Sequence, residues 1–148
     1  MWHCKRFNDL TNNELYQILY LRTATFVVAQ HRIYQEVDNS DQAAWHIFKS
    51  NAEGKIVAYA RVFLIDDGRN VSFGRVVTSP EVRGQGVGGQ LLTKIMDTIR
   101  QHYPDKNIVI ESQVQVQGFY ERVNFQPVGQ PFIYKATPHI KMTHAPLN

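Results

Sequence analysis

Four glycines occupy the six positions from 84 to 89: Gly84, Gly86, Gly88 and Gly89. Glycine reaches backbone conformations that other residues avoid, and it lets an anion approach the chain closely. A helix that begins behind such a loop offers unpaired N–H groups and the positive end of its dipole. The loop therefore predicts a phosphate-binding site. The alternative is a glycine-rich turn that binds nothing.

Two well-known phosphate loops do not match this context. A P-loop needs a Lys and then a Ser or Thr directly after its last glycine, and Gly89 is followed by neither. The dinucleotide pattern G-x-G-x-x-G is matched from Gly84 to Gly89, and Glu111 ends the next expected strand, where a ribose-binding acid belongs. However, residues 79–83 separate the preceding strand from the loop, and only 37 residues follow Glu111. A doubly wound dinucleotide-binding domain is therefore not expected.

The elements that must position this loop can be read from hydrophobic periodicity and from turn residues. Thr11 and Glu14 form a capping-box pattern, which predicts that the first helix begins there. Cys4 falls in an expected N-terminal strand. Further strands are expected at 46–49, 56–65, 71–78, 108–110, 125–128 and 132–135, and further helices at 86–102 and 116–123. Antiparallel hairpins followed by a strand–helix–strand crossover predict an α/β fold with a mixed sheet and helices on its faces.

Composition restricts the class of protein. The chain has 148 residues, 43% of them hydrophobic, which suits one globular domain spanning residues 1–148. A single cysteine, Cys4, excludes an intrachain disulfide, and no apolar run approaches the length of a membrane span. The net charge of +3 comes from scattered basic residues, unlike a nucleic-acid-binding arm. The six histidines show no paired metal-ligand spacing. We expect a cytoplasmic protein without metal, membrane or nucleic-acid partners.

Two motifs carry a resemblance to a known family. Arg83-x-x-Gly86-x-Gly88, between a strand and a helix, resembles the acetyl-CoA loop of the GNAT N-acetyltransferases. The run from Phe119 to Phe125, Phe-Tyr-Glu-Arg-Val-Asn-Phe, is similar to the family's next landmark. The chain is most similar to the ElaA-like branch, through Leu21-Arg22, Phe26–Gln30, Tyr34–Asp38 with Asp41, and Pro138–Met142. It departs from the branch's usual Glu at Ala29 and usual Cys-Pro near Arg32-Ile33, and from the superfamily's usual Asn and Gly at Gln113 and Asn124.

The resemblance implies a GNAT-like fold, a mostly antiparallel central sheet, and direct transfer of an acetyl group from acetyl-CoA to a primary amine of a small molecule or peptide. A non-catalytic acyl-CoA-binding module is the alternative, and a homodimer is possible. Tyr120 is the candidate general acid, because it lies where the family places its proton donor and a phenol is protonated at neutral pH. Glu111 and His139 are both candidate bases. The implied acceptor-binding residues are Asp38, Asp41 and His46. The implied cofactor-binding residues are Val76, Val77, Thr78, Arg83, Gly84, Gln85, Gly86, Val87, Gly88, Gly89, Gln113 and Phe119.

Overall fold

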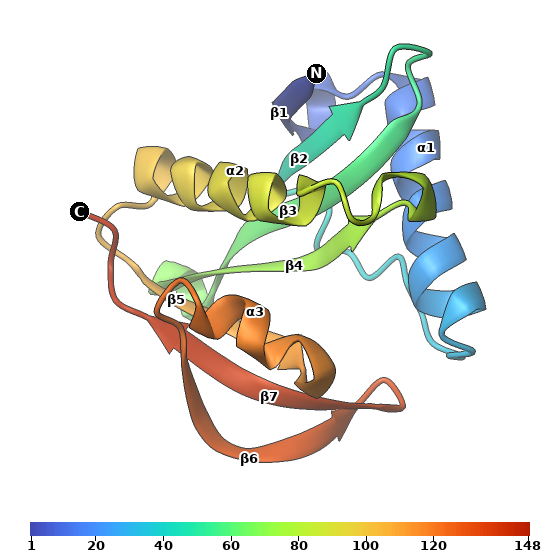
Figure 1. Ribbon diagram of the computed structural model, residues 1–148. Coiled ribbons are helices and arrows are strands. Elements are labelled where there is room, and N and C mark those ends of the chain that lie inside the picture. The colour runs from blue at the N-terminus through green and yellow to red at the C-terminus, as the bar shows by residue number, and fades with distance from the viewer.

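The computed structural model describes residues 1–148 as one seven-stranded sheet with helices on both faces (Figure 1). The strand order is β1-β2-β3-β4-β5-β7-β6, and every neighbouring pair is antiparallel except β4 and β5. The strands are β1 (Trp2–Arg6), β2 (Trp45–Ser50), β3 (Ile56–Ile65), β4 (Asn70–Thr78), β5 (Asn107–Gln113), β6 (Gln126–Tyr134) and β7 (Thr137–His144). The helices are α1 (Asn12–Arg22), α2 (Val87–His102) and α3 (Gln117–Glu121), and α1 continues as a wider π-helical segment over Thr23–Ala29.

The start of α1 confirms the predicted capping box. The Thr11 hydroxyl accepts a hydrogen bond from the backbone N–H of Glu14, and the Glu14 carboxylate accepts one from the N–H of Thr11. Each residue satisfies a backbone donor that the first helical turn leaves unpaired. The capping box therefore defines the residue at which α1 begins.

The two faces of the sheet bury separate apolar clusters. On β2, Ile47 belongs to the larger cluster with α2, and its neighbour Phe48 belongs to the smaller cluster with α1. Successive residues of a strand point to opposite faces, so α1 and α2 cover opposite sides of the sheet. The apolar side chains of α2 recur at helical spacing, and Leu91, Ile95 and Ile99 are fully buried.

The C-terminal strands differ from the prediction. A single long strand, β6, replaces the two expected at 125–128 and 132–135, and its register shifts between Val128 and Phe132 near Gly129, which takes φ +74°. The last strand, β7, was not predicted as a strand at all. The reason is its mixed pattern, since Pro138 interrupts it and only Ile140 and Met142 supply buried apolar side chains on alternate positions.

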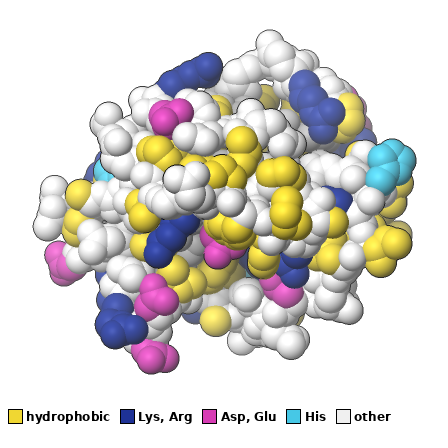
Figure 2. Space-filling model, turned by 90° about the horizontal axis from the view of Figure 1, so that it is seen from below, with side chains coloured by type: hydrophobic (Ala, Val, Ile, Leu, Met, Phe, Trp, Pro, Cys, Tyr) yellow, Lys and Arg dark blue, Asp and Glu magenta, His cyan; other side chains and the backbone are white.

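Strand β6 forms an edge of the sheet, and all nine of its residues are exposed. It runs along the bottom of Figure 1, and Figure 2 views the molecule from that side, with hydrophobic side chains gathered over the middle of the face. The large hydrophobic side chains that β6 exposes are Val128, Phe132, Ile133 and Tyr134. No helix in the structure combines the length and the apolar character that a membrane crossing requires.

The feature that matters for a site is the separation of β4 from β5. These two parallel strands pair only at Asn70 with Asn107 and at Val71 with Ile108, and they diverge beyond that point (Figure 1). The divergence leaves the edge of β4 from Ser72 onward without a strand partner on the β5 side. Unpaired backbone groups of this kind can bind an extended ligand as a further strand would be bound.

Candidate functional site

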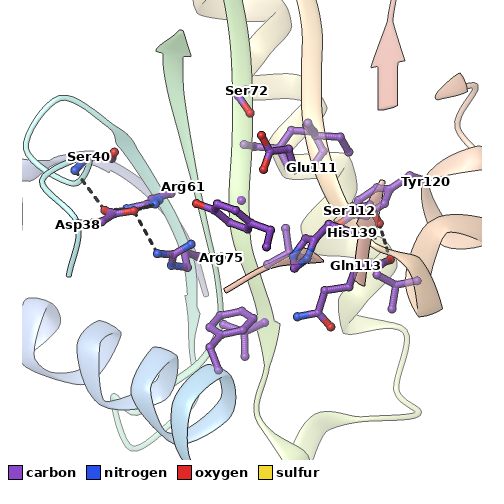
Figure 3. A pocket seen from close by; sticks show the side chains of 18 of the residues that line it. Asp38, Ser40, Arg61, Ser72, Arg75, Glu111, Ser112, Gln113, Tyr120 and His139 are labelled. Carbon is purple, nitrogen blue, oxygen red and sulfur yellow. Dashed lines mark hydrogen bonds and ion pairs between the residues drawn. The ribbon is translucent and has the colours of Figure 1, made fainter. Parts of the chain in front are cut away.

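A cleft of about 650 Å³ lies where β4 and β5 diverge, and it is lined by residues from both strands, from β7, from α3 and from the segment after α1. This volume is within the range of small-molecule sites. Nine of the residues predicted from sequence line the cleft: Asp38, Val76, Val77, Thr78, Arg83, Glu111, Gln113, Tyr120 and His139. Figure 3 shows Asp38 on one side of β4 and Glu111, Gln113 and His139 on the other.

A bulge in β4 shapes the first wall of the cleft. Tyr59 of β3 faces Val77, and Arg61 faces Gly74, so one residue of β3 lies opposite Arg75 and Val76. Arg75 takes φ +53°, a left-handed conformation that is uncommon outside glycine. The bulge turns the Arg75 side chain toward the residues that follow α1, where it pairs with Glu36 and Asp38.

The glycine loop joins this wall to α2. Gly84 and Gly86 take φ +80° and +78°, which explains why glycine occupies both positions. The N–H groups of Val87, Gly88 and Gly89, in the first turn of α2, donate to no acceptor of the chain. They are therefore free to donate to an anion at the positive end of the helix dipole.

Tyr120 projects from α3 toward the cleft. Its ring packs against Phe73, Phe119 and Phe125, and the residue is 6% exposed. Burial raises the pKa of the Tyr120 phenol above its ordinary value, so the hydroxyl holds its proton firmly at neutral pH. No group of the chain forms a hydrogen bond with this hydroxyl, and its residue lines the cleft, so a ligand there could take its proton.

The two candidate bases lie on neighbouring strands but differ in environment. His139 on β7 pairs with Gln113 on β5, and its side chain is buried at the cleft. Its Nδ1 lies 2.8 Å from the carbonyl oxygen of Thr137, and a carbonyl can only accept, so Nδ1 carries the proton and Nε2 has a free lone pair. Burial lowers the pKa of His139, with the nearby charge of Arg32 acting in the same direction. Glu111 is exposed at the cleft and has no ion-pair or hydrogen-bond partner.

The acidic residues predicted to hold an acceptor belong to an arginine network (Figure 3). Arg61 holds Asp38 through two contacts of 2.7 Å, and Arg75 lies 3.1 Å from the same carboxylate. Burial acts to raise the pKa of Asp38, but the hydrogen bond and charge of Arg61 outweigh it and lower the pKa well below its usual range. Asp38 is therefore ionised at physiological pH, and Arg61 and Arg75 balance its negative charge.

Asp41 and His46 lie behind this wall and do not line the cleft. Asp41 pairs with Arg22 at 2.7 Å and with Arg61 at 3.0 Å. The Nε2 of His46 lies 2.8 Å from the Asp41 carbonyl and so donates to it, while Nδ1 accepts from the Tyr59 hydroxyl at 2.7 Å. Both ring nitrogens are thus occupied, and burial lowers the pKa of His46. These two residues can affect an acceptor only through the arginines and the backbone that they hold.

The remaining residues singled out from the sequence lie at different places relative to the cleft. Gly89 and Phe119 line a separate hollow between α2 and α3, of about 470 Å³. Gln113 donates to the side-chain oxygen of Gln30 at 3.1 Å, which ties β5 to the segment after α1. Cys4 lies on β1, 3.6 Å from the Thr98 hydroxyl and outside the cleft. No group of three or more His, Cys, Asp or Glu side chains is arranged to hold a metal ion.

The sequence analysis assigned no role in the site to six charged or aromatic residues in or behind this wall. They are Arg22, Arg32, Tyr34, Glu36, Arg61 and Arg75. One signal was available, because Arg61 falls inside an apolar strand, where a buried charge requires a partner. The identity of that partner depends on the loop after α1, which periodicity does not describe.

Comparison with known proteins agrees with this geometry. A family model described as an acetyltransferase (GNAT) domain matches residues 8–145. Protein ElaA of Escherichia coli is 37% identical over 144 residues, covering 95% of this chain and 94% of that protein. Its crystal structure aligns with a TM-score of 0.90, at 36% identity, covering 97% of each chain. A Pseudomonas aeruginosa structure described as an acyl-CoA N-acyltransferase aligns with a TM-score of 0.91, at 36% identity, covering 98% of this chain and 99% of that one. The expected mixed α/β acyl-CoA N-acyltransferase fold is confirmed.

Proposed function

The chain belongs to the GNAT acyltransferases, in the ElaA-like branch, and we propose that it moves an acetyl group from acetyl-CoA to a primary amine by direct transfer. The fold is one that uses acyl-CoA. The observation that carries the proposal is the meeting of three features at one cleft: the diverging strands β4 and β5, the adjoining glycine loop, and the side chains of His139 and Tyr120.

Cofactor binding is assigned to backbone groups. The free N–H groups of Val87 to Gly89 would hold the pyrophosphate at the start of α2. The unpaired edge of β4 at Val76 to Thr78 would pair with the pantetheine arm, which carries amide groups able to bond as a strand does. Arg83, which lines the cleft beside the loop, adds a positive charge for the phosphates.

We assign the general base to His139 rather than to Glu111. An amine acceptor with a lysine-like pKa near 10.4 is mostly protonated at pH 7, so a base must remove a proton before it can attack. The imidazole of His139 is neutral at that pH because burial lowers its pKa. The bond from Nδ1 to Thr137 leaves Nε2 as the basic nitrogen. Glu111 has no partner that orients its carboxylate, and it is left as an attractive charge for the ammonium group.

Tyr120 supplies the proton that the departing sulfur needs. The Nε2 of His139 takes one proton from the acceptor nitrogen, which then bonds to the acetyl carbon as the carbon–sulfur bond breaks. The Tyr120 hydroxyl donates its proton to the sulfur. The nitrogen loses two protons overall, of which one restores Tyr120 and the other passes from His139 to solvent. A positioned acid or base of this kind contributes about 10²–10⁴-fold in rate.

The experiment is acetyl transfer from labelled acetyl-CoA to a panel of amines, polyamines and peptides, with release of the CoA thiol as the readout. A transferase releases CoA only when an acceptor is present and yields the labelled amide. The competing function, a non-catalytic acyl-CoA-binding module, would bind acetyl-CoA in calorimetry and release no CoA with any acceptor.

A further inference from the structure

Arg32 differs from the other buried arginines of the molecule. Three arginines are buried, namely Arg22, Arg32 and Arg61. Arg22 and Arg61 each lie within 3.0 Å of carboxylates, whereas Arg32 has no acidic partner. Arg32 is 6% exposed and lines the cleft. A buried charge without a counter-ion is costly, so its retention at the cleft points to a charge that a ligand brings.

The contacts that Arg32 does make leave one end of its guanidinium free. Nε donates to the carbonyl oxygen of Lys135 at 2.7 Å, and Nη1 donates to the side-chain oxygen of Gln30 at 3.1 Å. Nη2 donates to no acceptor of the chain and stays accessible to solvent. The side chain is therefore held in place by neutral groups, with its remaining donors available to a ligand.

Nearby side chains add positive charge rather than removing it. The guanidinium of Arg32 lies 4.7 Å from the centre of the Tyr34 ring, and the ammonium group of Lys135 lies 4.9 Å from the same ring. The Tyr34 hydroxyl donates to Glu36, but Glu36 is already paired with Arg22 and Arg75. A cation over an aromatic ring gains only about 0.5–2 kcal/mol, which does not replace a counter-ion.

The position of Arg32 connects it to the candidate base. The oxygen of Gln30 that accepts from Arg32 also accepts from Gln113, and Gln113 lies opposite His139 in the pairing of β5 with β7. Arg32 and His139 also line the same cleft. An acceptor with its amine at His139 therefore has Arg32 on the adjoining wall.

We infer that Arg32 binds a carboxylate carried by the acceptor, so that the substrate is an aminocarboxylate rather than a simple amine or a polyamine. This inference rests on the proposed acetyl transfer. A carboxylate matches the planar guanidinium, and its single charge matches the single unpaired guanidinium at this wall. The amine end is left for His139, with Glu111 lining the same cleft.

The test compares acceptors that differ only in this group. Glycine, β-alanine and γ-aminobutyrate, which space the two groups differently, are assayed against their amides and against phosphoethanolamine, with CoA release as the readout. We expect the best aminocarboxylate to exceed its amide by about 10- to 100-fold in kcat/KM, the range for losing a charge-assisted hydrogen bond. Amides within threefold of the acids, or a tenfold preference for the phosphate, would overturn the inference while leaving acetyl transfer intact.

Variants separate recognition from folding. Arg32→Gln should raise the KM of the aminocarboxylate about 10- to 100-fold and leave the acetyl-CoA KM and the turnover of the amide within threefold. Arg32→Lys, which keeps the charge, should recover part of the loss. Arg69→Gln, at an exposed arginine outside the cleft, also removes one positive charge and should change neither the KM of the aminocarboxylate nor that of acetyl-CoA. Equal losses with acid and amide would make Arg32 a structural residue.

If no acceptor is turned over, the proposed acetyl transfer is refuted. A binding measurement then still tests whether Arg32 binds a carboxylate. N-acetylglycine, N-acetyl-β-alanine and N-acetyl-γ-aminobutyrate, and their amides, are titrated calorimetrically into the protein with CoA present. At least one acid should bind tenfold or more tightly than its amide, and Arg32→Gln should remove the difference. Acids and amides that all bind within twofold of one another would refute the role of Arg32.

Discussion

Replacing Gly86 by Val tests whether the glycine loop binds the cofactor or is only a turn. Gly86 takes φ +78° at the residue before α2, and a Cβ added there meets no atom of the chain within 4 Å. The protein itself therefore has space for the side chain, and the structural cost comes from the backbone conformation. A left-handed residue other than glycine costs roughly 1–2 kcal/mol, and somewhat more when it is β-branched.

The chain contains a matched control. Gly54, in the turn between β2 and β3, takes φ +80°, and a Cβ added there also meets nothing within 4 Å. Gly54→Val and Gly86→Val should therefore lose similar stability. For a chain of this length, 1–2 kcal/mol lowers the melting temperature by roughly 2–8 °C. The two variants differ only in what the added side chain blocks.

The expected difference appears in acetyl-CoA binding measured by calorimetry. At Gly86 the valine would stand where the phosphates approach the free N–H groups of the first turn of α2. Losing one hydrogen bond to a charged group costs about 1.5–3 kcal/mol, which raises the dissociation constant about 10- to 150-fold. Gly54→Val should bind within twofold of the unchanged protein.

Gly88→Val supplies a variant without backbone strain, because Gly88 does not have a positive φ and its Cβ position is also open. It should weaken binding as Gly86→Val does and leave the melting temperature nearly unchanged. If Gly86→Val and Gly88→Val bind acetyl-CoA as well as Gly54→Val does, the loop does not hold the phosphates. The loop would then be a turn, and the site of the phosphates would lie elsewhere.

Three further substitutions test the other assignments. Tyr120→Phe keeps the ring and removes the proton, so single-turnover transfer should slow about 10²–10⁴-fold while acetyl-CoA affinity stays unchanged. A rate within threefold of the unchanged protein would show that Tyr120 is not the general acid. The acidic limb of the kcat/KM profile should lie below pH 6.5, because burial lowers the pKa of His139 and the base stays neutral until the pH falls through this lowered pKa. In His139→Gln the limb should vanish and the rate should fall about 10²–10⁴-fold. A limb that survives in this variant would belong to another group. Asp41→Asn leaves the fully buried Arg22 with one carboxylate fewer, so urea unfolding should show that the free energy of unfolding falls by about 3–5 kcal/mol. A fall of under 1 kcal/mol would show that Glu36 alone neutralises Arg22.

Local sequence determined the features whose causes lie within a few residues. The capping box of Thr11 and Glu14 needs only the first turn of α1, and the loop from Gly84 to Gly89 needs only glycine's access to positive φ. The buried stripe of α2 follows from helical spacing alone. These signals, with the motif from Phe119 to Phe125, were enough to indicate the family and the fold.

Tertiary structure decided which charged groups meet, because their partners are distant in the chain. The resemblance implied that Asp38 and Asp41 bind the acceptor, but the fold brings Arg61, 20 or more residues away, against both carboxylates. We preferred His139 over Glu111 because His139 is buried where β7 pairs with β5, whereas Glu111 is exposed.

The unpaired state of Arg32 is the clearest case of this kind. Its contact with the Lys135 carbonyl joins residues 103 positions apart, and its lack of a carboxylate is a property of the whole cleft. The energy of a charge depends on solvent exposure and on every neighbouring charge, so it cannot be read from the identity of adjacent residues. Backbone conformation and helix capping act over one or two turns, so the sequence alone determined the glycine loop and the start of α1. Only the folded chain decided which charged side chains of the cleft are paired and which are not.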